Sequence, residues 1–181
     1  MTTILAVTDG HRAWIGSDTR IGNEDRFFDS GGPKWIVSDK RDWAMGVAGY
    51  PGEQQALAGY VDVLRGCSDF DLPTEIRACL SERGWTPKRA GDGGLPHGGS
   101  TFIIATPCRV IMLGVDFTII PIDTGVLAAD GSGHEYALGA WHALTAGAPG
   151  VETAERVNTC LATAMALDPY SGGKAWTEVL T

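Results

Sequence analysis

The second residue of the chain, Thr2, carries the group best suited to covalent chemistry, because removal of Met1 would leave its hydroxyl beside a free α-amine. A small residue after the initiator methionine favours that removal. The freed α-amine has a pKa of about 7.7–8.0, close to that of a general base working at neutral pH. It can take the hydroxyl proton while the oxygen attacks a carbonyl carbon. Many proteins begin with Met-Thr, so this pair alone is weak support for an enzyme.

Other catalytic patterns are missing from the sequence. The four histidines lack the His-Glu-x-x-His spacing of zinc peptidases, and no Gly-x-Ser-x-Gly motif is present. The glycine-rich segment 89–99 lacks the spacing of a phosphate-binding loop and is predicted to be a flexible connection. We therefore expect no metal and no cofactor.

The four cysteines are widely scattered and form no Cys-x-x-Cys pair; they are Cys67, Cys79, Cys108 and Cys160. No apolar run reaches the ~20 residues of a membrane helix, and the N-terminus lacks the basic and apolar regions of a signal peptide. We expect reduced, mostly buried thiols in a cytoplasmic protein that does not contact a membrane.

The elements that must position Thr2 come in blocks. Apolar and β-branched runs bounded by turn residues predict strands at 2–8, 13–18, 35–38, 43–48, 101–105, 109–114, 119–122, 126–129 and 175–180. Helical spacing of apolar residues predicts helices at 53–64, near 74–83, at 134–144 and at 152–167. Helices that arrive in pairs argue against a Rossmann-type alternation. The blocks favour an α+β fold, a four-layer αββα sandwich, in which residues 1–181 form a single domain.

Several short motifs, taken together and in order, resemble those of proteasome β subunits and of the HslV peptidase. They are Thr2-Thr-Ile-Leu-Ala-Val7, Gly16-Ser-Asp-Thr-Arg20, Lys34, Gly46-Val-Ala-Gly49, Gly99-Ser-Thr101, Gly131-Ser-Gly133 and Asp168-Pro-Tyr-Ser-Gly-Gly173. The resemblance covers nearly the whole chain. The fold that it implies, the N-terminal nucleophile (Ntn) hydrolase fold, is the αββα sandwich indicated by the blocks.

The resemblance implies a catalytic role for six side chains. Thr2 would be the nucleophile. Lys34 would be a buried ammonium that eases deprotonation at Thr2, and Asp18 would keep Lys34 charged and oriented. A polar cluster that hydrogen-bonds the Thr2 amine would consist of Ser132, Asp168 and Ser171. Taken by their local sequence alone, Asp18 and Lys34 could be a surface ion pair, Ser132 a helix N-cap and Asp168 part of a turn.

The resemblance also implies how a substrate would be held. The backbone N–H of Gly49 would stabilise the oxyanion, with Gly46 as the alternative. The pocket for the residue before the scissile bond would be lined by Ile21, Gly32, Ile36 and Val47. Because none of the four is charged, we expect an apolar preference. Arg20 is expected to form a structural ion pair nearby.

The charge of the chain limits its partners. It has 14 Lys and Arg against 22 Asp and Glu, a formal net charge of −8. Binding to nucleic acid phosphates needs clustered positive charge, so we expect no nucleic acid partner.

The sequence thus predicts a threonine-type endopeptidase that acts on polypeptides through Thr2. The resemblance further implies a homo-oligomeric ring or barrel that encloses the sites, served by an ATPase or α-type ring that the sequence does not identify. Two alternatives stay open: a small-molecule amidase of the Ntn class, and a non-catalytic ring component that retains Met1.

Overall fold

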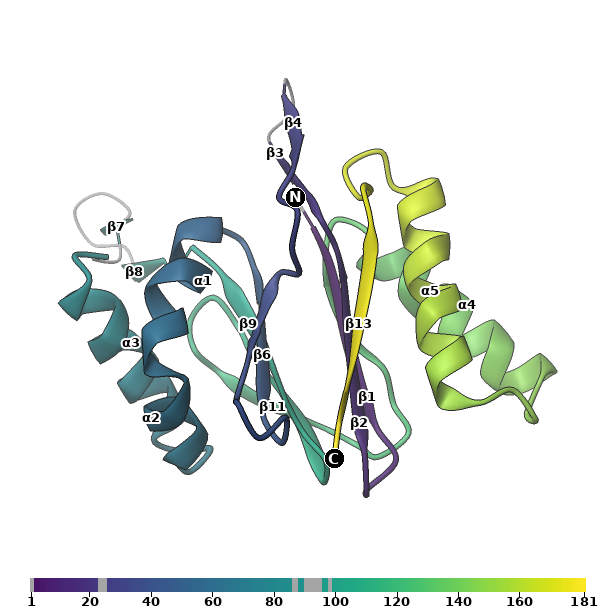
Figure 1. The fold of residues 1–181 in the computed structure, drawn as a ribbon, viewed down its shortest axis with the longest axis horizontal. Coiled ribbons are helices and arrows are strands. Elements are labelled where there is room, and N and C mark those ends of the chain that lie inside the picture. Colours follow the sequence, from purple (N-terminus) through teal and green to yellow (C-terminus); the bar gives the residue numbers. More distant parts are fainter. Residues whose placement is uncertain (1, 23–25, 86–87, 90–95, 98) are drawn as a thin grey trace.

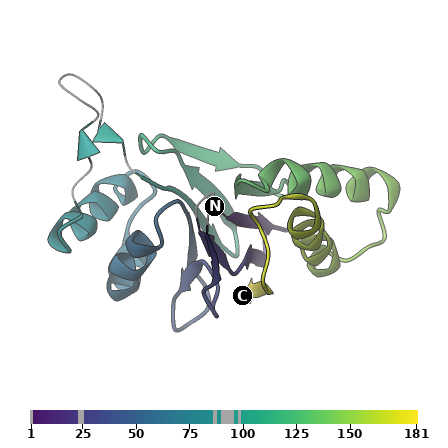
Figure 2. The ribbon, with the colours of Figure 1, turned by 90° about the horizontal axis from the view of Figure 1, so that it is seen from above.

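The computed structural model describes residues 2–22, 26–85, 88–89, 96–97 and 99–181. Two antiparallel sheets, of four and five strands, pack face to face with helices on both outer sides, and two further sheets have two strands each (Figures 1 and 2). The predicted four-layer αββα sandwich is therefore confirmed. No helix in these ranges is long and apolar enough to cross a membrane.

The first sheet has the strand order β12-β1-β2-β13. Its strands are β1 (Thr3–Thr8), β2 (Ala13–Asp18), β12 (Ala128–Gly131) and β13 (Ala175–Leu180). Every residue of β1 and β2 is buried. The reason is that side chains alternate along a strand and this sheet is covered on both faces. Ile4 and Ala6 face the other sheet, whereas Leu5 and Val7 face helices.

The second sheet has the strand order β11-β10-β9-β6-β5. Its strands are β5 (Trp35–Val37), β6 (Ala44–Ala48), β9 (Thr101–Thr106), β10 (Arg109–Leu113) and β11 (Ile119–Ile122). Gly46 of β6 faces Ile4 so closely that a Cβ atom there would lie 2.6 Å from the Ile4 Cγ2 atom. A glycine at this position thus allows the two sheets to approach.

Each outer face carries helices. On the second sheet lie α1 (Pro51–Leu57), the 3-10 helix η1 (Ala58–Tyr60), α2 (Val61–Gly66) and α3 (Leu72–Glu82). On the first sheet lie α4 (His134–Gly147) and α5 (Thr153–Leu167). Three separate apolar clusters fill the spaces between the four layers.

The expected helix 53–64 is divided into α1, η1 and α2. Gly59 lies at the break, and glycine is a poor helix former. The Arg83 guanidinium approaches this turn and lies 5.3 Å from the centre of the Tyr60 ring. The expected strand 126–129 is shifted to β12, which pairs with β1 as far as Gly131.

Two short pairs of strands were not predicted from the sequence. β3 (Arg20–Gly22) and β4 (Phe27–Asp29) form a hairpin that projects beyond the sheets beside the N-terminus (Figure 1). The glycine-rich segment 89–99 was predicted to be a flexible connection. Residues 90–95 and 98 within it lie outside the described residues, and at its ends β7 (Lys88–Arg89) pairs with β8 (Pro96–His97).

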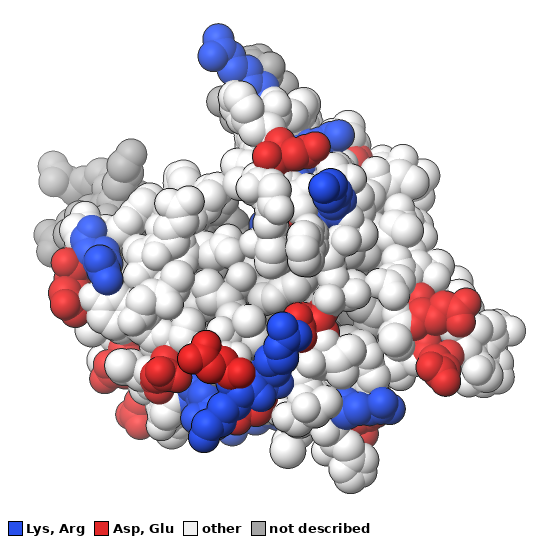
Figure 3. Space-filling model, in the orientation of Figure 1, with Lys and Arg blue, Asp and Glu red and all other residues white. Residues whose placement is uncertain are grey.

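The expectation of mostly buried cysteines is met in part. All four cysteines are free; Cys79 and Cys160 are buried, whereas Cys108 is exposed and Cys67 is intermediate. On the face in Figure 3, basic and acidic side chains lie interspersed and no broad basic area forms.

Candidate active site

Strand pairing brings Thr2 and Asp18 to the same end of the first sheet. β1 and β2 are antiparallel, and Ile4 pairs with Ser17. The residue that enters β1 therefore lies beside the residue that ends β2. Thr2 is 6% exposed and Asp18 is fully buried. This end of the sheet lies at the N-terminus in Figure 1, where the hairpin of β3 and β4 projects.

The Asp18 carboxylate accepts four hydrogen bonds. Its Oδ1 atom accepts from the Lys34 Nζ atom at 2.6 Å and from the Thr3 backbone N–H at 2.9 Å. Its Oδ2 atom accepts from the backbone N–H groups of Gly172 at 2.9 Å and Arg20 at 3.2 Å. A buried carboxylate is costly unless such partners satisfy it. The Asp18–Lys34 pair is therefore part of the buried site, and the surface alternative is wrong.

The backbone of Lys34 is also held by hydrogen bonds. Its N–H donates to the Ser17 Oγ atom at 2.9 Å, and its carbonyl accepts from the Val47 N–H at 3.0 Å. Lys34 is 4% exposed. Burial is the largest influence on its pKa and lowers it from the ordinary value, although the Asp18 carboxylate acts in the opposite direction.

A second buried carboxylate, that of Asp168, accepts hydrogen bonds from both predicted serines. Its Oδ2 atom accepts from the hydroxyl groups of Ser132 and Ser171, each at 2.6 Å. The Ser171 oxygen is also 2.6 Å from the Thr3 hydroxyl oxygen. Burial raises the pKa of Asp168, but the hydrogen bonds from the two serine hydroxyls and from the backbone N–H groups of Tyr170 and Ser171 together hold the pKa below its ordinary value. The three residues therefore form one network beside Thr2.

Ser132 is not the N-cap of the helix that follows it. The N-cap of α4 is Gly133, and no side chain caps this helix. The Ser132 oxygen lies 3.4 Å from the Thr2 carbonyl oxygen. Since its single proton is donated to Asp168, the Ser132 oxygen is left as an acceptor towards the Thr2 end of the chain.

The two candidate oxyanion glycines occupy different environments. Gly46 lies inside β6 and pairs with both β5 and β9, so it faces the inter-sheet core. Gly49 follows β6, has a φ angle of 150°, and a Cβ atom there would collide with Ser100. The Ser100 Oγ atom accepts a hydrogen bond from the Tyr50 N–H at 2.9 Å, which holds this turn. Of these two glycines, only Gly49 lines the cavity beside Thr2 and Lys34.

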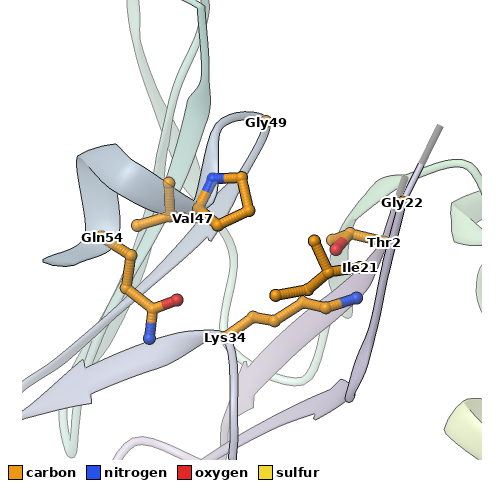
Figure 4. A pocket seen from close by; sticks show the side chains of 8 residues that line it. Thr2, Ile21, Gly22, Lys34, Val47, Gly49 and Gln54 are labelled. Atoms are coloured by element: carbon orange, nitrogen blue, oxygen red, sulfur yellow. The ribbon is translucent and has the colours of Figure 1, made fainter. Parts of the chain in front are cut away.

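A cavity of about 40 Å³ connects these groups (Figure 4). Its lining consists of Thr2, Ile21, Gly22, Lys34, Val47, Gly49, Pro51 and Gln54. The predicted Ile21 and Val47 are present, whereas Gly32 and Ile36 are not. Ile36 packs within the helix-side core, which also contains Val47, and does not reach the cavity. The lining residues that were not predicted are Gly22 of β3 and Pro51 and Gln54 of α1.

Several contributors were missed by the sequence analysis. Gly172 and Thr3 act through backbone N–H groups, which leave no sign in the residue type. Ser17 acts through its hydroxyl, and Gln54 acts through its amide from a helix. Arg20 was expected in an ion pair; its guanidinium instead donates to the carbonyls of Pro169 and Ser171.

The described residues contain no group of three or more His, Cys, Asp or Glu side chains placed to hold a metal ion. The site therefore consists of a hydroxyl, an ammonium, two carboxylates and backbone donors. Such a set suits nucleophilic attack on a carbonyl with stabilisation of the resulting oxyanion.

Comparison with known proteins identifies the fold. No protein-family model matches the chain, and no curated protein sequence matches it. Among solved structures, BPH of Thiobacillus denitrificans in complex with epoxomicin is 19% identical with a TM-score of 0.78, and the match covers 99% of this chain and 98% of that chain. Eukaryotic HslV from Trypanosoma brucei is 21% identical with a TM-score of 0.71, and the match covers 99% of both chains. The chain therefore has the Ntn-hydrolase fold of the proteasome-type subunits.

Proposed function

We propose that this protein is a threonine-type peptidase whose nucleophile is the Thr2 hydroxyl. The observation that carries the proposal is the convergence of Thr2, Lys34 and Gly49 on one cavity, with Lys34 held by a buried Asp18. Met1 lies outside the described residues, and its removal is part of the proposal. Without removal, the Thr2 nitrogen is an amide and cannot act as a base.

In the proposed reaction, the Thr2 α-amine takes the proton of the hydroxyl as Oγ1 bonds to the substrate carbonyl carbon. The Gly49 N–H stabilises the oxyanion, and the Lys34 ammonium lowers the energy of the developing negative charge. The C–N bond then breaks and the amine product leaves with the proton. Water, deprotonated by the α-amine, hydrolyses the acyl ester and restores Thr2.

The Asp168 network supports the role of the α-amine. The Ser132 oxygen can accept a hydrogen bond from that amine, because its own proton is donated to Asp168. Ser171 links the same carboxylate to the Thr3 hydroxyl. This arrangement orients the start of β1 and therefore the nucleophile.

We further propose that polypeptides are the substrates and that copies of this chain assemble into a ring or barrel around the sites, within the cytoplasm. Phe28 of the projecting hairpin is 65% exposed, and an exposed aromatic side chain is stabilised by burial against another subunit. Sedimentation velocity tests the assembly; a monomer at micromolar concentration would contradict it.

The size of the cavity favours a second candidate, an amidase of small molecules. A volume of about 40 Å³ holds only a few water-sized groups. Hydrolysis rates on acyl amides and on peptides of increasing length separate the two candidates. Rates that rise with peptide length support the peptidase, and rates confined to short acyl amides support the amidase.

The central test is intact mass after incubation with an epoxyketone, which bonds to both the hydroxyl and the free amine of an N-terminal threonine. We expect one inhibitor mass on the chain that lacks Met1. Thr2→Ala should abolish the adduct and hydrolysis with assembly intact, whereas Thr159→Ala, an exposed threonine on α5, should change neither. Activity that survives Thr2→Ala would disprove the mechanism.

A further inference from the structure

The side chain of Gln54, on α1, hydrogen-bonds to the backbone on both sides of Lys34. Its Nε2 atom donates to the carbonyl of Pro33 at 3.0 Å and to that of Trp35 at 3.1 Å. An amide NH₂ has two hydrogens, so both are used. The helix is therefore tied to the segment that carries the lysine.

The two carbonyls lie on an edge that no strand of the described residues covers. β5 is the last strand of its sheet. The Lys34 carbonyl accepts from the Val47 N–H of β6, and successive carbonyls of an extended chain point in opposite directions. Those of Pro33 and Trp35 consequently point away from β6. Gln54 supplies the donors that a further strand would have supplied.

The same helix follows the proposed oxyanion donor. α1 begins at Pro51, two residues after Gly49. Gly49, Gln54 and Lys34 all line the cavity. The side chains of Gln54 and Lys34 reach it from different elements (Figure 4). One side chain thus connects the element that follows the oxyanion donor to the backbone that holds the ammonium.

We propose that Gln54 is a positioning residue that fixes Lys34 relative to Gly49 across the cavity. The inference rests on the proposed function, because it concerns the geometry of that reaction. Its loss leaves two backbone carbonyls without their donor and allows the segment 33–35 to move. Displacement of a stabilising group by a fraction of an ångström slows the chemical step more than it weakens binding.

The test compares Gln54→Met with Gln55→Met. Methionine has a similar length and cannot donate, and Gln55 is an exposed neighbour on the same helix. Each purified protein is titrated with the epoxyketone to obtain kinact and KI, and its melting temperature is recorded. We expect kinact of Gln54→Met to fall about tenfold or more with KI within about twofold, and Gln55→Met to match the wild type.

Two results would overturn the inference. An unchanged kinact shows that Lys34 holds its position without Gln54. A change in KI alone shows that Gln54 is only a wall of the cavity. If Gln54→Met does not fold, Gln54→Asn decides in its place, because its amide is one methylene too short to span both carbonyls. A reduced kinact then supports the inference and an unchanged one overturns it.

Failure of the proposed function gives a different result. Wild-type protein that lacks Met1 and forms no adduct contradicts the threonine mechanism itself. Wild-type protein that reacts, together with a Gln54→Met variant that reacts equally fast, contradicts only the role of Gln54.

Discussion

Two ion pairs of this molecule have similar chemistry and opposite surroundings. Lys34–Asp18 joins side chains that are 6% and 0% exposed, whereas Arg65–Asp42 joins side chains that are 33% and 29% exposed. Asp18 is also satisfied by three backbone N–H groups, and Asp42 by the Ser38 hydroxyl.

The difference shows what burial adds to an ion pair. For Asp42, the hydrogen bond from Arg65 is the main influence and lowers the pKa of the carboxyl group. For Lys34, burial is the main influence and lowers the pKa of the ammonium. The surface pair stabilises both of its charges, while the buried pair keeps an ammonium whose charge is weakly solvated. Such an ammonium interacts strongly with a developing oxyanion.

The largest expected effect comes from removing the buried ammonium. Lys34→Ala should lower kcat/KM at least ~10²-fold, the scale of losing one electrostatic stabiliser. Steady-state hydrolysis of a fluorogenic peptide measures it. The matched control is Lys40→Ala, because Lys40 is exposed. Equal loss in both variants would contradict a special role for Lys34.

The pH dependence of the free energy of unfolding tests the burial of Lys34. The folded protein holds Lys34 at a lowered pKa, so between that value and the unfolded value of about 10.4 the unfolded chain binds more protons. The unfolding free energy of the wild type, relative to Lys34→Ala, should therefore rise as pH rises through this window. Urea denaturation from neutral pH upwards measures it. A difference that falls with pH would mean that the pKa of Lys34 is raised.

The smallest effect is expected at the surface pair. Arg65→Met should leave hydrolysis unchanged and shift the melting temperature by no more than a few degrees, because exposed pairs are screened by water and salt. Differential scanning fluorimetry at low and high salt measures it, and the shift should shrink at high salt. A loss of activity as large as that of Lys34→Ala would remove the contrast between the pairs.

Much of the architecture could be predicted from local pattern. The strands 13–18, 119–122 and 175–180 lie where they were expected, since each is an apolar or β-branched run between turn residues. The hairpin of β3 and β4 could not be found in this way. Each of its strands has only three residues, too few for a period, and its outer aromatic residues are exposed.

For the site, the motifs singled out residues that the fold brings together: Thr2, Asp18 and Lys34 at one end of the first sheet, and Ser132, Asp168 and Ser171 beside them. Their catalytic roles remain predictions for the experiments above. The pocket was predicted less well. Ile36 faces the helix-side core, and Gln54 supplies part of the wall from a helix that the motifs did not include.

The sequence by itself determined the order of the blocks, the faces of the long strands and the set of polar groups available for chemistry, because these depend on residue type and spacing along the chain. Only the tertiary structure decided which backbone N–H groups reach Asp18, which glycine opens onto the cavity and which amide holds the Lys34 segment. The physical reason is that every residue except proline carries the same backbone N–H donor. Its partner is set by how strands pair and helices pack across distant parts of the chain.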